Sequence, residues 1–170
     1  MDFRKPIISQ YHAALEMLKQ TILACPEALW NNPDDRNKFW EVAYHTLFFT
    51  HLYLQESRQT FHLWSGHRDE YRFEREDKSE PVEPATKAIV LAYLAFCQQQ
   101  VVEQVSTMVL DENSGFDWLR FTKFELQFYS IRHIQQHVGE LMERLGPQAS
   151  EIDWVGSKRA EGSPQSSQPQ

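Results

Sequence analysis

Apolar residues recur every three to four positions along four long stretches of the chain, which is the spacing of one face of an α-helix. The pattern predicts helices over about residues 3–23, 37–61, 85–109 and 121–145. Pro26 ends the first, and Asp34 or Asp35 is expected to cap the second. Gly146-Pro147 ends the fourth. The sequence therefore predicts an all-α fold, a four-helix bundle.

The second predicted helix is apolar on almost every face, which is typical of a helix buried on all sides. Its apolar residues are Phe39, Trp40, Val42, Tyr44, Leu47, Phe48, Phe49, Leu52, Tyr53 and Leu54. His45 lies within this run. It is therefore expected in the interior of the bundle, where a polar side chain without a partner is costly.

The fourth predicted helix carries a histidine pair, His133 and His137, four residues apart. On a helical wheel the pair falls on one shoulder, between a broad apolar arc and the opposite polar arc. Leu126, Tyr129 and Glu140 lie near the pair on this wheel. The position is suited to the mouth of a cleft.

The segment from Ser65 to Pro84 is polar and rich in charges of both signs, and it predicts a long connection between the second and third helices. Two to eight residues suffice for an ordinary helix hairpin. A connection of this length would let the two helices run parallel. It is interpreted either as a solvated surface loop or as a partial lid over the histidines.

Length and composition indicate one soluble globular domain, residues 1–155, followed by a disordered tail at 156–170 that is rich in Ser, Gln, Pro and Gly. The segment before the tail holds Ile152, Trp154 and Val155, which are expected to pack back on the bundle. The formal charge is −7 and no basic patch is visible, so nucleic acid is a disfavoured partner.

No secretory signal and no apolar run of about 18 residues is visible, so no membrane partner is expected. The chain has two cysteines, Cys25 and Cys97, without a disulfide framework or a CxxC motif. A cytoplasmic location follows as the prediction.

The histidines suggest a metal site. Side chains at i and i+4 on a helix are about 5–6 Å apart at Cβ, so His133 and His137 could hold one ion. A third imidazole from a facing helix would complete three ligands and leave coordination positions open. His45 and His51 both compete for that place, because they point about 120° apart on one helix. The alternative is a chance pair and a core histidine.

The remaining histidines have no comparable partners in the sequence. They are expected at the surface or on a helix flank: His12, His62 and His67.

The histidine motifs resemble those of the DinB/YfiT-like metalloenzymes. The first motif is WEVAYHTLFF, which contains His45. After about ninety residues follows HxxxHxGxL, here His133-Ile-Gln-Gln-His137-Val-Gly139-Glu-Leu141. The resemblance covers the chain from the first helix to about Val155. It implies a four-helix bundle of unusual connectivity, often dimeric, with His45, His133 and His137 as ligands of a divalent metal.

Some members of that family are S-transferases or isomerases that use a low-molecular-weight thiol. Three neutral imidazoles leave a divalent ion its full charge, so it can hold a thiol as thiolate or lower the pKa of bound water to about 7. A bound thiolate points to a thiol-dependent S-transferase, and a bound water of lowered pKa points to a metal-dependent hydrolase. Zinc suits imidazole well and is the expected metal, and nickel, manganese, iron and cobalt also fit.

Other residues are candidates for the surroundings of the site. Supporting polar groups are Tyr44, Glu56, Tyr129 and Glu140, each of which has an alternative as a packing aromatic or a solvated acid. Apolar walls for an organic substrate are expected from Phe48, Phe49, Leu52 and Leu126.

A non-enzymatic hypothesis also fits the sequence. The chain would then be a dimeric metal-binding or interaction module, whose histidines bind metal only adventitiously. The surplus of aromatic residues could cover a symmetric interface, and with the resemblance it predicts a homodimer. The tryptophans concerned are Trp30, Trp40, Trp64, Trp118 and Trp154.

Overall fold

The computed structural model describes residues 2–71 and 82–158, and within these ranges the fold is all-helical. Its helices are α1 (Arg4–Ala24), α2 (Glu27–Trp30), α3 (Phe39–Leu54), α4 (Lys87–Thr107) and α5 (Lys123–Leu145), with 3₁₀ turns η1 (Asp69–Tyr71) and η2 (Gly146–Glu151). In these residues the only β pairing is one isolated bridge between Asn113 and Thr122. The all-α prediction is confirmed.

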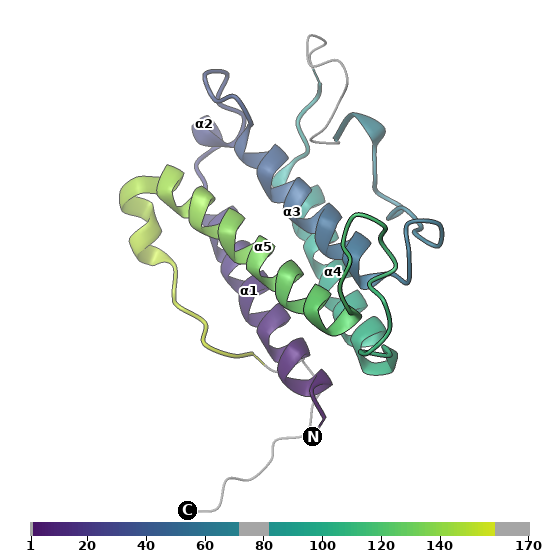
Figure 1. Cartoon of the computed structure of the whole chain (residues 1–170). Helices are drawn as coiled ribbons and strands as arrows, with labels where there is room; N and C mark the ends of the chain where they lie inside the picture. The colour runs from purple at the N-terminus through teal and green to yellow at the C-terminus, as the bar shows by residue number, and fades with distance from the viewer. Residues whose placement is uncertain (1, 72–81, 159–170) are drawn as a thin grey trace, which may run out of the picture.

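The four long helices pack around one core, and each contacts two others: α1 lies against α4 and α5, and α3 lies against the same two (Figure 1). Helices α3 and α4 run in the same direction, because the residue numbers of their contacting pairs increase together along the two helices. Tyr44 meets Tyr93, and further on Gln55 donates to Gln100. The connection between α3 and α4 must therefore return along the length of the molecule.

Helix α5 runs antiparallel to α3. Arg144, near the end of α5, donates to the carbonyl of Asn37 just before α3, and Lys123, at the start of α5, donates to the carbonyl of Glu56 just after it. These two contacts tie the helices together at both ends. They fix which residues of α3 face which residues of α5.

Helix α3 is shorter than predicted, because it ends at Leu54 rather than near Phe61. Gln55 is extended, with φ −80° and ψ 166°, and a turn follows in which the hydroxyl groups of Ser57 and Thr60 bond to each other and to backbone N–H groups. Such local side-chain bonds compete with a helix. Phe61 fits the apolar spacing of the helix, so the sequence pattern predicted an end that is too late.

The predicted aspartate cap of α3 is wrong. The helix begins at Phe39, and the carboxylate of Glu41 accepts the Lys38 N–H at 2.8 Å, as in the second half of a capping box. Asp34 and Asp35 lie in the preceding turn, too early to reach the first helical N–H groups. The end of α5 is as predicted, since Gly146 follows Leu145 with φ +58°.

Residues after η2 return along α1. Ile152 and Val155 pack against the core as expected, whereas Trp154 is 79% exposed. The Lys158 N–H bonds to the Ser9 carbonyl, and its ammonium pairs with Glu16 at 2.6 Å. The chain thus keeps its contacts with α1 to residue 158, and residues 159–170 of the expected tail lie outside the described residues.

The long connection leaves α3 and reaches α4 at residue 86, where the Trp30 indole N–H donates to the Ala85 carbonyl at 2.8 Å. This bond anchors the start of α4 beside α2. The expected lid falls partly on residues 72–81, which lie outside the described residues. Of the helices in the described ranges, none has both the length and the apolarity needed to cross a bilayer.

The loop between α4 and α5 is seated on the turn after α3 through Gly115. Gly115 has φ +88°, and a Cβ added to it would lie 1.9 Å from the carbonyl oxygen of Glu56. Only glycine fits this close backbone approach without strain.

Gly115→Ala should therefore lower the free energy of unfolding by more than about 1 kcal/mol, measured by urea denaturation. The matched control is Gly139→Ala, because Gly139 lies within α5 and an added Cβ would meet nothing within 4 Å. That change should raise stability by about 0.5–1 kcal/mol. Equal effects of the two substitutions would contradict the proposed seating of the loop.

Candidate metal centre

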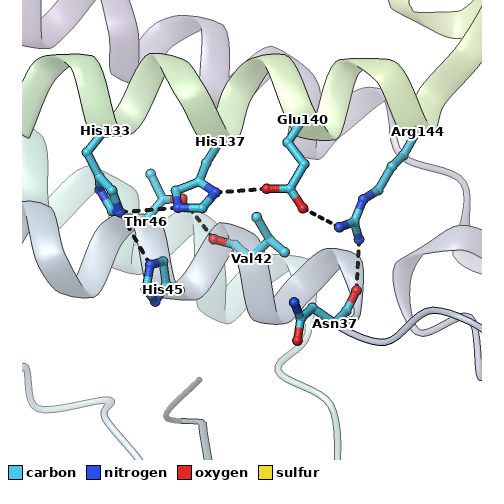
Figure 2. Close-up of polar contacts among 8 residues, drawn as sticks. All are labelled: Asn37, Val42, His45, Thr46, His133, His137, Glu140 and Arg144. Atoms are coloured by element: carbon cyan, nitrogen blue, oxygen red, sulfur yellow. Dashed lines mark hydrogen bonds and ion pairs between the residues drawn. The ribbon is translucent and has the colours of Figure 1, made fainter. Parts of the chain in front are cut away.

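The antiparallel packing of α3 on α5 brings three imidazoles together. His133 and His137 project from one face of α5 toward His45 on α3 (Figure 2). The Nε2 atoms of His133 and His45 are 3.3 Å apart, and those of His137 and His133 are 3.1 Å apart. One nitrogen from each ring lies within 4.8 Å of the other two. The structure thus brings together the three predicted histidines.

The spacing of these nitrogens suits one metal ion. Imidazole binds zinc at about 2.0–2.1 Å, so two ligands of a tetrahedral ion lie about 3.3 Å apart. Two of the three nitrogen pairs, separated by 3.1 and 3.3 Å, match this edge length, and the third pair lies within 4.8 Å. Three neutral nitrogen donors are also a ligand set that suits zinc and its first-row neighbours.

Proton counting gives a second argument for a cation. The Nδ1 of His137 lies 3.0 Å from a carboxylate oxygen of Glu140, so Nδ1 carries the proton and Nε2 presents a lone pair. The Nε2 of His133 then has one proton to donate, and the Nε2 atoms of both His45 and His137 lie within reach of it. A single proton shared between two acceptors is weakly directed to each, whereas a cation accepts all three lone pairs.

Glu140 connects the site to the end of α5. One carboxylate oxygen accepts from His137, and the other pairs with Arg144, which in turn donates to the Asn37 carbonyl at 2.8 Å. A carboxylate in this position fixes the tautomer and ring orientation of a metal-binding histidine. The Nδ1 of His133 is buried and has no hydrogen-bond partner among the described residues, so it lacks comparable support.

Aromatic packing holds the imidazoles of His45 and His133 in place, and burial keeps these two neutral. Phe49 contacts the rings of both His45 and His133, with centroids 4.7 and 5.8 Å apart. Burial, with the neighbouring imidazoles of His133 and His137, lowers the pKa of His45 to about 3. Burial and the nearby His137 lower the pKa of His133 to about 4. Neutral imidazole is the form that binds metal.

A pocket of about 770 Å³ opens beside the cluster, with His45 and His133 on its wall. Its other lining residues are largely aromatic: Tyr44, Phe48, Phe49, Leu52, Tyr53, Arg58, Phe61, Leu63, Tyr71, Trp118 and Tyr129. The pocket explains why His45 is half-buried rather than fully interior as expected. Helix α3 faces this space along part of its length, and the early end of the helix leaves room for it.

The predicted apolar walls are only partly correct. Phe48, Phe49 and Leu52 line the pocket. Leu126 does not, because it is 1% exposed and packs in a small cluster behind the wall with Leu52 and Tyr53.

The candidate supporting groups fall in different places. Tyr44 and Tyr129 line the pocket, and Glu140 bonds His137. Glu56 is exposed beyond the end of α3 and is therefore not on the face of His45. Arg58, which also lines the pocket, was missed because the sequence pattern placed it inside a helix.

His51 lies away from the cluster. Its Nδ1 is 3.2 Å from the hydroxyl of Tyr93 on α4, and its ring packs on Phe61 and Phe96. Burial and the nearby His67 lower its pKa to about 4. The side of α3 that carries His51 thus faces α4, and the side that carries His45 faces α5.

Two of the remaining histidines depart from the prediction. His12 is 7% exposed, because it lies on the inner face of α1. The side chain of His67 is 4% exposed, since it packs on Phe48 and its Nδ1 lies 2.8 Å from the Tyr44 hydroxyl. A histidine in a polar connection gives no sequence signal of such burial. His62 is exposed as expected.

The metal-free protein should lose stability as the pH falls below about 6.5. Unfolded histidines titrate near 6.5, whereas His45 and His133 titrate at about 3 and about 4 when folded. Between these values the unfolded chain binds protons that the folded chain does not, which favours unfolding. The measurement is urea denaturation of chelator-treated protein from pH 7.5 to 4.5. The free energy of unfolding should decline less with pH for the double variant His45→Asn/His133→Gln than for the unchanged protein. An identical decline would contradict the lowered pKa values.

Comparison of the chain with protein family models, with curated proteins and with solved structures finds no match. The DinB/YfiT-like resemblance therefore stays a prediction that rests on the histidine motifs.

Proposed function

We propose that this protein is a divalent-metal-dependent enzyme whose ligands are His45, His133 and His137. The observation that carries the proposal is the convergence of three imidazole nitrogens beside an aromatic pocket, with His45 and His133 on its wall. A structural metal site is closed by four protein ligands, whereas three ligands beside a pocket leave a position for a reacting molecule. Zinc is the proposed metal, with nickel, manganese, iron or cobalt as alternatives.

We also propose the DinB/YfiT-like four-helix bundle as the family fold. The parallel course of α3 and α4 and the long connection between them support this topology. The homodimer expected from the sequence stays a prediction. An interaction module without catalysis is the competing hypothesis, and it gives no reason for an aromatic pocket beside the histidines.

The reaction we propose is transfer of a small thiol to an organic electrophile: the thiol proton passes to solvent, the sulfur forms a bond to carbon, and the leaving group on that carbon departs with the electron pair of the bond that breaks. A bound divalent ion would hold the sulfur as thiolate, since three neutral ligands leave its double charge uncompensated. The protein's own residues supply the surroundings: Glu140 holds the Nδ1 proton of His137 and so keeps Nε2 available. Phe48, Phe49 and Leu52 offer apolar contact area for the organic part and exclude water from it.

His133→Ala or His137→Ala should remove most of the bound metal, because two imidazoles rarely retain an ion that three hold. Metal content is measured by mass spectrometry on protein purified without an affinity tag, with helicity checked by circular dichroism. His51→Ala is the matched control, since His51 bonds Tyr93 on α4 and should leave the metal in place. Loss of metal in His51→Ala but not in His45→Ala would show that the ligand assignment is wrong.

The cobalt-substituted protein should develop a sulfur-to-metal charge-transfer band when reduced thiols are added. Titration of small cellular thiols, followed by absorption spectroscopy, measures this directly. No band with any thiol, together with turnover of esters or amides, would reject the transferase and favour hydrolysis. No response in either assay would favour the interaction module.

A further inference from the structure

The pocket beside the histidines carries one side chain that neither the metal nor the apolar walls explain. Arg58, in the turn after α3, is the only Lys, Arg, Asp or Glu among the described residues that line it. Across residues 2–71 and 82–158 no carboxylate forms an ion pair with Arg58. Its neighbour is instead the ring of Trp118, whose centroid lies 6.0 Å from the guanidinium carbon.

The turn that carries Arg58 is held in place from several sides. The hydroxyl groups of Ser57 and Thr60 bond within it, and the Phe61 N–H bonds to the Arg58 carbonyl. The carbonyl of Glu56 accepts from Lys123 and lies against Gly115 of the next loop. These contacts fix the backbone from which the Arg58 side chain extends, and the ring of Trp118 offers its guanidinium a cation–π partner. A turn that is already ordered loses less entropy when a ligand binds.

We propose that Arg58 binds a carboxylate of the substrate, so that the substrate class is an organic anion with an apolar body. This inference rests on the proposed function, because the metal-binding end of the same molecule would lie at the histidines. A guanidinium binds carboxylate through two parallel N–H bonds. Arg58 is an exposed residue, so the preference for an anion comes from this paired geometry rather than from burial. The chain carries a net charge of −7, and Arg58 places a cation on the pocket wall, which gives an anionic ligand a local attraction there.

The fold sets the length of a ligand that could reach the histidines with one end and Arg58 with the other. His45 and Leu54 are nine residues apart on α3, which corresponds to about 13 Å along the helix axis. Arg58 begins beyond Leu54, and its long side chain can return part of this distance. A chain of about five to seven carbons between sulfur and carboxylate is therefore expected to bind better than one of two.

The first test uses paired thiols that differ only in charge. The cobalt protein is titrated with 3-mercaptopropionate, 6-mercaptohexanoate and 8-mercaptooctanoate, and with the corresponding mercaptoalcohols. The acid should bind about tenfold more tightly than its alcohol at one of the two longer lengths, as expected for one charged hydrogen-bonded pair. Arg58→Gln should abolish this preference and leave the alcohol's dissociation constant within about twofold, whereas Arg120→Gln, the matched control in the neighbouring loop, should retain it.

A second test is independent of the metal. Tryptophan fluorescence of the chelator-treated protein is titrated with 4-phenylbutyrate and with 4-phenyl-1-butanol, and only the acid should bind more weakly to Arg58→Gln. An acid preference that persists in Arg58→Gln, or that falls equally in Arg120→Gln, would overturn the role of Arg58. Charge-transfer bands of equal affinity for acid and alcohol would reject Arg58 and keep the thiol function. Absence of any band with an intact phenylbutyrate preference would reject the thiol function and keep Arg58.

Discussion

The antiparallel packing of α3 on α5 is the constraint on which the rest of the site depends. It sets His45 opposite His133 and His137, with nitrogen separations of 3.1 and 3.3 Å along the cluster. The same packing brings the end of α3 to the start of α5, where Lys123 bonds the Glu56 carbonyl. The turn with Arg58 and the loop with Trp118 therefore meet beside the histidines, and the pocket lies within this arrangement.

Placing three imidazoles in such a position is costly without a ligand for them. Burial lowers the pKa of His45 and of His133, and the nitrogens of the three rings converge with too few protons to make every contact a good hydrogen bond. The chain from Glu140 through Arg144 to the Asn37 carbonyl adds a fixed orientation for His137. These features are what a site for a divalent cation would require, and three histidines so placed could hold one.

The helices and the His133–His137 pair could be predicted from sequence because each depends on local periodicity. The i,i+4 spacing of His133 and His137 decides that they share a face, whatever they pack against. The choice between His45 and His51 could not be made from periodicity. Helix α3 is apolar all round because it packs against both α4 and α5, and only the tertiary structure shows which histidine faces α5.

Features set by tertiary contacts were predicted poorly. The end of α3 was placed too late because Phe61 fits a helical pattern, although the Ser57–Thr60 turn interrupts the helix. The burial of His67 depends on Phe48 and Tyr44, which lie far from it in sequence. Arg58 could not be recognised as a pocket residue for the same reason.

The most direct test of a three-histidine centre is X-ray absorption spectroscopy of the zinc-loaded protein. The account predicts three imidazole ligands at about 2.0–2.1 Å, seen as multiple scattering from the rings, with the remaining coordination from water or added thiol. A spectrum with one imidazole or none, or with four protein ligands and no exchangeable position, would contradict it.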